Sequence, residues 1–135
     1  MQAPAGKRFS LRERMRSFRF AFKGIAAVLR TQHNFRIQLA AFILVVAAGF
    51  IFGISPAEWC IVFLASALVL SLEIINSAIE FLVDLLSPEY HEKAGMIKDI
   101  SAGAVLVAAI MAAITGIIIF GKEIIAFFNT SPAIK

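Results

Sequence analysis

Five polar residues recur at helical spacing in an otherwise apolar stretch: Glu73, Asn76, Ser77, Glu80 and Asp84. At about 100° per residue they share one face of a helix, within roughly 60° of Glu73. Carboxylates are costly against lipid, so this polar stripe must face protein, water, a cation or a substrate. Three like charges on one face repel one another. Hydrogen bonding between helices does not require several like charges, whereas a magnesium site does.

The polar stripe therefore predicts catalysis or ion handling. Hard cations such as Mg²⁺ take carboxylate oxygens and bridge them to phosphates. A carboxylate held in a partly dry interface is also suited to accept the proton of an alcohol, as a general base. For Asn76 or Ser77 taken alone, hydrogen bonding between helices is the favoured interpretation.

A second set of candidate residues follows the stripe. Lys98 and Asp99 stand at the expected start of the last apolar stretch, where free backbone N–H groups and the helix dipole favour phosphate. Lys98 adds a point charge for a phosphate, and Asp99 is placed to cap the helix or to reach a metal or a ribose. The alternative is an ordinary cytoplasmic lysine beside an N-cap aspartate. His91, in the preceding loop, is by itself more typical of a surface histidine than of a ligand.

The composition indicates that much of the chain is in contact with lipid. Of 135 residues, 60% are hydrophobic and 16% are charged, against about 25% charged in soluble proteins. A chain this small cannot hide so much apolar surface in a core of its own, which excludes an ordinary cytosolic globule. Cys60 is the one cysteine, so no disulfide forms within the chain. The net charge of +4 is explained by position in the membrane, and we expect no nucleic-acid partner.

Three apolar stretches are long enough to span a membrane. We expect helices at about 33–54, 56–86 and 94–120, which make up a three-span domain over residues 32–127 with a tail at 128–135. Ser55-Pro56 predicts a turn and a helix that begins at proline, and Ser87-Pro88 predicts the end of that helix. The expected fold class is therefore an all-α membrane protein.

Basic residues indicate the orientation. Nine of the thirteen Lys and Arg residues lie in the first 36 positions. The positive-inside rule then assigns the N-terminus and the 87–99 loop to the cytoplasm, and three spans leave the C-terminus outside. Residues 1–36 lack an apolar core followed by a small-residue cleavage site, so no signal peptide is expected.

The segment 9–31, after a flexible segment expected at 1–8, is amphipathic. Its apolar residues share one direction, and five cations lie about 80–140° away. The apolar set is Leu11, Met15, Phe18, Phe22, Ile25 and Leu29, and the cations are Arg12, Arg16, Arg19, Lys23 and Arg30. This pattern predicts a helix in the membrane interface. Whether it is only an anchor, or its cations also meet a phosphorylated ligand, stays open at this point.

The order of motifs resembles a known family. The run Glu73-Ile-Ile-Asn76-Ser-Ala-Ile-Glu80 with Asp84, then Ser-Pro-Glu-Tyr-His-Glu and Lys-Asp, is similar to the small bacterial membrane lipid kinases, the prokaryotic diacylglycerol kinase and undecaprenol kinase family. The resemblance covers about residues 18–120. It implies a homotrimeric bundle with an amphipathic surface helix, active sites shared between subunits, and transfer of the γ-phosphate of MgATP to a lipid alcohol in the bacterial inner membrane.

The resemblance also implies roles by position. Glu73 corresponds to the catalytic base, which also contacts the lipid, Asn76 to an active-site residue, and Glu80 to a metal-binding carboxylate that contacts the nucleotide. The nucleotide contacts further along the chain fall on Glu89, Tyr90, His91, Lys98 and Asp99.

Two departures from the family pattern lie near the N-terminus. The second metal-binding glutamate falls on Gln32, whose carbonyl can ligate Mg²⁺ beside the nucleotide but brings no charge. A family arginine falls on Glu13, so a neighbouring arginine takes its nucleotide or lipid contact. Lys23 and Arg36 are the further residues that we assign to the lipid substrate.

The lipid and two rival functions remain to be weighed. The stretch Ile54-Ser-Pro-Ala-Glu-Trp59 is more similar to the undecaprenol kinase branch of the family, and this resemblance favours undecaprenol over diacylglycerol. One rival is a small proton- or ion-conducting membrane protein that uses Glu73, Glu80 and Asp84 as a relay, and the second is a non-catalytic membrane assembly subunit. Conduction is disfavoured because the stripe occupies only the cytoplasmic half and the other spans offer no matching carboxylates.

Overall fold

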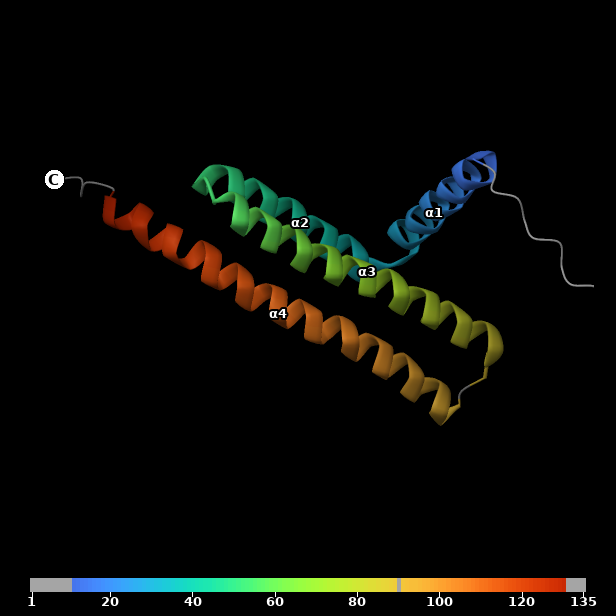
Figure 1. Ribbon diagram of the computed structural model, residues 1–135. Coiled ribbons are helices and arrows are strands. Elements are labelled where there is room, and N and C mark those ends of the chain that lie inside the picture. The colour runs from blue at the N-terminus through green and yellow to red at the C-terminus, as the bar shows by residue number, and fades with distance from the viewer. Residues whose placement is uncertain (1–10, 90, 131–135) are drawn as a thin grey trace, which may run out of the picture.

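Four helices make up the described part of the chain, which is residues 11–89 and 91–130 of the computed structural model. They are α1 (Leu11–Thr31), α2 (His33–Phe52), α3 (Pro56–Leu86) and α4 (Glu92–Thr130) (Figure 1). Within these ranges there is no strand, and the all-α class is confirmed. Helices α2, α3 and α4 are each long and apolar enough to cross a membrane. The expected flexible segment 1–8 and the end of the tail lie outside the described residues.

The turn between α2 and α3 follows from backbone signals. Gly53 ends α2 with a φ of 64°, in the left-handed region that glycine enters without steric cost. Ser55 and Glu58 then form a capping box, in which Glu58 Oε2 accepts the backbone N–H of Ser55 at 2.8 Å, and Pro56 is the first helical residue. The other oxygen of Glu58, Oε1, pairs with Lys122 of α4. The predicted turn and helix start are thereby confirmed.

The ends of α3 and α4 are set differently. Helix α3 ends at Leu86, just before Pro88, which cannot continue it. Helix α4 runs on to Thr130, beyond residue 120, where the hydropathy pattern ends the third span. Lys122 interrupts the uncharged run but does not stop a helix, and the next proline along the chain is Pro132.

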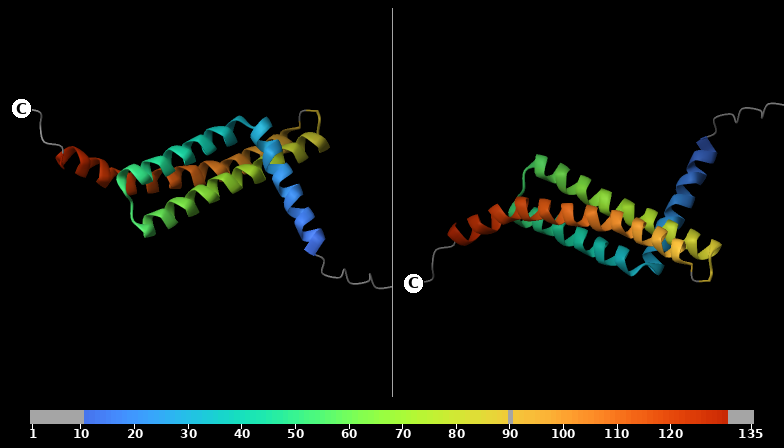
Figure 2. Two further views of the ribbon diagram at one scale, coloured as in Figure 1. Left: turned by 90° about the horizontal axis from the view of Figure 1, so that it is seen from above. Right: turned by 90° about the horizontal axis from the view of Figure 1, so that it is seen from below.

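Helices α2, α3 and α4 lie alongside one another, and α4 packs mainly on α3. Helix α1 leaves this bundle at a steep angle (Figure 2). At the α2–α3 turn, the buried side chains of Ile54, Val62 and Ile119 form the core cluster, with Phe52 and Trp59 packed against it. The ring of Trp59 is close enough to α2 to require glycine there, because a Cβ on Gly49 would lie 2.7 Å from Trp59 Cη2.

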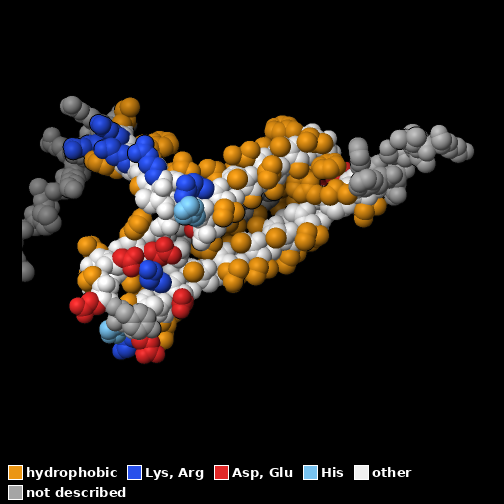
Figure 3. All heavy atoms as spheres, turned by 180° about the vertical axis from the view of Figure 1, so that it is seen from behind, with side chains coloured by type: hydrophobic (Ala, Val, Ile, Leu, Met, Phe, Trp, Pro, Cys, Tyr) orange, Lys and Arg blue, Asp and Glu red, His pale blue; other side chains and the backbone are white. Residues whose placement is uncertain are grey.

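Large apolar side chains cover the outside of the bundle (Figure 3). Leu44, Leu64 and Ile117 are 70%, 72% and 72% exposed, one on each of the three long helices. Exposure on this scale is unfavourable in water, because soluble monomers keep contiguous apolar patches small. The outer surface is therefore suited to lipid.

Candidate active site

The polar stripe of α3 changes from buried to exposed along the helix. Glu73, Asn76 and Ser77 are buried against neighbouring helices, with exposed fractions of 3%, 5% and 0%. Glu80, further along α3, is half-buried, and Asp84 is exposed. The stripe thus faces protein at one end and opens to the surface near the α3–α4 loop.

Glu73 is held by an amide from α2. Gln38 Nε2 donates to Glu73 Oε2 over 3.0 Å. The second oxygen, Oε1, accepts no hydrogen bond from the residues described, and none of their cations forms an ion pair with this carboxylate. Burying a carboxylate with one neutral donor is costly. Glu73 therefore has acceptor capacity that the fold itself does not use.

Gln38 was not singled out from the sequence as a functional residue. A signal was present, because an amide inside an apolar run is expected to face protein rather than lipid. Its partner was not readable, since the pairing joins residues 35 positions apart on different helices.

Asn76 links the stripe to α4. Its Nδ2 donates to Glu80 Oε1 at 2.9 Å, and its Oδ1 lies 2.6 Å from the hydroxyl of Ser101. The Ser101 hydroxyl also lies 2.8 Å from the backbone carbonyl of Lys98 and can donate its one hydrogen to either oxygen. Asn76 thus orients the Glu80 carboxylate. Ser101, which sequence reasoning missed, fixes Asn76 from the first turns of α4.

Ser77 has a local structural contact. Its hydroxyl donates to the backbone carbonyl of Glu73 at 2.8 Å, one turn earlier on the same helix. This bond lies within α3, whereas the sequence predicts a bond between helices for Ser77 taken alone, and it gives Ser77 a structural contact rather than one with a ligand.

Lys98 lies at the open end of the stripe. Its Nζ pairs with Asp84 Oδ1 at 2.9 Å, and the two side chains are 37% and 63% exposed. An ion pair this exposed contributes little stability, so breaking it for a ligand costs little. Asp99, the next residue, is exposed.

The α3–α4 loop carries the remaining residues expected to contact nucleotide. Glu89 and His91 are exposed, and Tyr90 lies outside the described residues. The backbone N–H of Lys93 donates to His91 Nδ1 at 3.2 Å, and the Ser87 hydroxyl donates to the carbonyl of Glu89 at 3.2 Å. These contacts order the loop and leave the Glu89 carboxylate free to meet a ligand.

Three candidate residues lie on α1 and at the start of α2. Gln32 is the N-cap of α2, half-buried, and its side chain makes no capping hydrogen bond. Lys23 is exposed, with Nζ 6.0 Å from the centre of the Phe20 ring, and Arg36 is exposed. Across residues 11–89 and 91–130, no hydrogen bond or ion pair joins these three to the stripe.

Opposite charges gather at one end of the molecule. Figure 3 shows the cations of α1 on one side and the acidic side chains of α3 and the loop below them. Carboxylates attract a divalent cation and can accept a proton, while cations attract phosphate. This end therefore has the charges that a phosphate ester bound with a metal would need.

The described residues fit a metal only together with another ligand. Among them no group of three or more His, Cys, Asp or Glu side chains is placed to hold an ion. Glu80 has one oxygen taken by Asn76 and one, Oε2, with no partner in the part of the chain described. Mg²⁺ is commonly bound by one or two carboxylates plus substrate phosphates, so this donor set fits a cation that arrives with a nucleotide.

Residues 19–120 match the family model described as prokaryotic diacylglycerol kinase. The chain is 42% identical over 105 residues to an undecaprenol kinase of Bacillus subtilis, covering 78% of this chain and 85% of the relative. It is 42% identical over 101 residues to a diacylglycerol kinase of Synechocystis sp., covering 74% and 58% of the two chains. A diacylglycerol kinase of Escherichia coli is 35% identical over 96 residues, covering 71% and 79%.

Proposed function

The chain belongs to the prokaryotic diacylglycerol kinase family and is a lipid kinase that uses ATP, and we propose that it phosphorylates undecaprenol or diacylglycerol with Glu73 as the base. The products would be undecaprenyl phosphate or phosphatidic acid. The observation that carries the proposal is Glu73 itself, a buried carboxylate with one neutral donor and one oxygen without a partner among the described residues. Such a group is suited to take a proton from an alcohol.

The reaction is a direct in-line transfer. The lipid hydroxyl oxygen attacks the γ-phosphorus of ATP, the bond from that phosphorus to the ADP oxygen breaks, and the hydroxyl proton passes to Glu73. Phosphoryl transfer of this kind depends mainly on positioning and on neutralising charge. Asn76 supports it by orienting the Glu80 carboxylate, two turns along α3 from the base.

Glu80 and Gln32 are the residues that would hold Mg²⁺, with Asn76 positioning Glu80. A bound Mg²⁺ supplies charge neutralisation on the phosphates. Gln32 brings a neutral carbonyl, and its lack of a capping bond leaves that carbonyl free.

The nucleotide is bound at the α3–α4 loop and the start of α4. Lys98 holds the phosphates after exchanging its exposed pair with Asp84 for them. The rest of the nucleotide is covered by Asp99 and by the loop residues Glu89, Tyr90 and His91.

The lipid substrate reaches the site from the bilayer. Lys23 on α1 and Arg36 in the first turn of α2 are exposed. There they meet the polar head of the lipid or the phosphate in transfer. Undecaprenol is the favoured alcohol, on the Ile54 to Trp59 stretch and on the name of the Bacillus subtilis relative. The ion-conducting alternative has no support from the relatives.

The assembly and orientation belong to the same proposal. We place the chain in the bacterial inner membrane as a homotrimer, with the N-terminus in the cytoplasm and the C-terminus outside. Helix α1 lies in the interface, because Met15, Phe18 and Phe22 are 75%, 68% and 69% exposed along one side and its cations lie on the other. One subunit alone offers too few walls for a nucleotide and a lipid together, which favours sites shared between subunits.

Transfer of labelled phosphate from ATP to extracted lipid tests the proposal. Purified protein in mixed micelles is given undecaprenol and diacylglycerol side by side, with and without Mg²⁺. We expect Mg²⁺-dependent labelling of at least one alcohol, with undecaprenol preferred. Labelling of neither would contradict the proposed reaction, and labelling without any divalent cation would contradict the metal assignment.

A further inference from the structure

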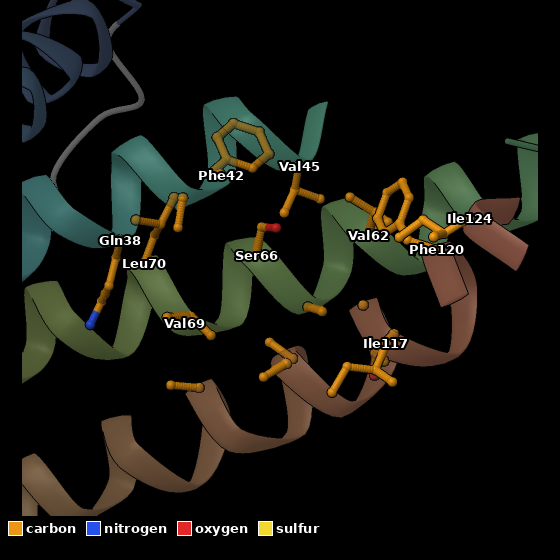
Figure 4. A pocket seen from close by; sticks show the side chains of 17 residues that line it. Gln38, Phe42, Val45, Val62, Ser66, Val69, Leu70, Ile117, Phe120 and Ile124 are labelled. Carbon is orange, nitrogen blue, oxygen red and sulfur yellow. The ribbon is translucent and has the colours of Figure 1, made fainter. Parts of the chain in front are cut away.

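A partly open apolar cavity of about 510 Å³ lies between α2, α3 and α4 (Figure 4). Its walls are apolar or small side chains from all three helices, such as Phe42, Val69 and Gly116. Each of these helices is a candidate membrane span, so the cavity lies at membrane depth. Pockets of roughly 300–1,000 Å³ with few polar groups are typical of small-ligand sites.

One end of the cavity is polar and lies next to Glu73. Figure 4 shows Gln38 and Leu70 at one end and Phe120 and Ile124 at the other. The Gln38 amide nitrogen holds Glu73, while its Oε1 is buried and has no hydrogen-bond partner among the described residues. Leu70 precedes Glu73 by one turn of α3, so the carboxylate lies just past the polar end of the cavity.

The cavity is long and open along one side. Its lining on α4 extends from Ala109 to Ile124, which is about 22 Å at 1.5 Å per residue. Carbon atoms in contact are about 3.5–4.0 Å apart, so apolar walls of this length let an extended hydrocarbon chain make contacts along the whole cavity.

We propose that this cavity binds the hydrocarbon chain of the lipid alcohol, with the hydroxyl at the Gln38 end. The proposal rests on the kinase function proposed above and assigns the part of the substrate that the active-site residues do not contact. Gln38 Nε2 positions Glu73, whose free oxygen then accepts the hydroxyl proton, and the buried Oε1 of Gln38 marks the polar end of the cavity. The open side of the cavity lets the chain enter laterally from the bilayer.

The apolar walls of the cavity indicate which kind of molecule binds there. Water is disfavoured because a stable buried water needs two to four polar partners and the walls offer almost none. An empty cavity at membrane depth would forgo dispersion contacts that a hydrocarbon chain provides. An amphiphile with one polar terminus and one long apolar chain matches a cavity with one polar end.

Two neighbouring alanines on α3 provide a matched test. Ala65 lines the cavity, whereas Ala67 is exposed and does not. Each is replaced by leucine, and kcat/KM is measured for linear isoprenoid alcohols and for diacylglycerols of increasing chain length. Wild type and Ala67→Leu should gain kcat/KM with chain length and then level off. Ala65→Leu should level off at shorter chains and lose about tenfold or more on long chains, with short chains little changed.

Identical chain-length profiles for Ala65→Leu and Ala67→Leu would overturn the proposal. A change of oligomeric mass in Ala65→Leu alone would also overturn it, because the cavity would then be an interface between copies. If Ala65→Leu does not fold, Ala112→Leu on the α4 wall is compared with Ala104→Leu on the exposed side of α4. Failure of wild type to phosphorylate any alcohol would instead refute the kinase reaction, so the two failures are distinguishable.

Discussion

Glu58, near the start of α3, has both carboxylate oxygens occupied within the fold, whereas Glu73 and Glu80 each keep one oxygen without a partner among the described residues. Glu58 Oε2 accepts from the backbone N–H and the hydroxyl of Ser55, and Oε1 pairs with Lys122. Glu73 and Glu80 each accept a single amide N–H. Helix α3 thus carries one carboxylate whose two oxygens are both bound within the fold and two carboxylates that each keep one free oxygen.

The difference separates structural charge from charge that is available to a ligand. A cation and a helix cap compensate Glu58, so nothing further is needed to stabilise it. Glu73 is more buried than Glu58, and Glu73 and Glu80 each receive one neutral donor and form no ion pair with the residues described, which leaves negative charge uncompensated. Uncompensated charge at membrane depth is costly, and we infer that a ligand cation and a substrate proton balance it.

Replacing Glu73 by glutamine should have the largest effect. The amide keeps the shape and a hydrogen bond to Gln38 but cannot take a proton, so kcat should fall about 10²–10⁴-fold. The measurement is phosphate transfer at saturating ATP and lipid, with oligomeric mass and nucleotide binding as folding controls. Glu58→Gln is the matched control and should keep turnover. Comparable turnover in the two variants would remove the distinction drawn between the two carboxylates.

Replacing Gln32 by glutamate should strengthen the metal site to which Glu80 is assigned. A second negative charge beside the metal should lower the Mg²⁺ concentration for half-maximal activity by about tenfold. Asn34→Glu adds the same charge two residues away on an exposed position and should leave the Mg²⁺ dependence unchanged. A Mg²⁺ dependence equal to that of wild type in Gln32→Glu would show that this residue does not approach the metal.

Replacing Gly49 by alanine should affect only the end of the bundle near Glu58. The new Cβ would meet the Trp59 ring at 2.7 Å, and such overpacking costs about 1–3 kcal/mol of unfolding free energy. Denaturant titration in detergent measures this loss, and kcat per folded protein should not change. Gly103→Ala, where nothing lies within 4 Å of the new Cβ, should be neutral or slightly stabilising. Equal stability of the two variants would contradict the Trp59 contact.

Replacing Lys122 by methionine should have the smallest effect. The lysine is 58% exposed, and Glu58, whose side chain is 15% exposed, keeps its two hydrogen bonds from Ser55, so loss of the pair should lower thermal stability slightly. Turnover and Mg²⁺ dependence should match those of wild type, because the pair lies far along the bundle from the stripe. A loss of turnover in this variant would show that the two ends of α3 are coupled.

Local signals were enough to predict most of the fold. Ser55-Pro56 and the proline after Ser87 delimit α3, because backbone chemistry at these positions leaves few alternatives. Helix α4 runs on to Thr130, past the expected end of the span at residue 120, since a helix does not need apolar residues to continue. Helical periodicity also placed Glu73, Asn76 and Glu80 on one face.

Contacts between helices could not be predicted from one sequence. The pairing of Gln38 with Glu73 and that of Ser101 with Asn76 depend on how α2 and α4 rotate against α3, which no local pattern fixes. The same holds for Asp84, which shares the stripe but pairs with Lys98. Spacing along a helix predicts a common face and not the partner that meets it.

Binding of Mn²⁺ together with a non-hydrolysable ATP analogue tests the central claim most directly, because it reads the charge of the stripe without turnover. Electron paramagnetic resonance reports free Mn²⁺ in titrations of wild type, Glu80→Gln and Glu58→Gln. We predict that Glu80→Gln weakens Mn²⁺ binding about tenfold or more, while Glu58→Gln binds as wild type does. Equal Mn²⁺ affinity in all three proteins would contradict the assignment of the α3 carboxylates to a nucleotide-bound cation.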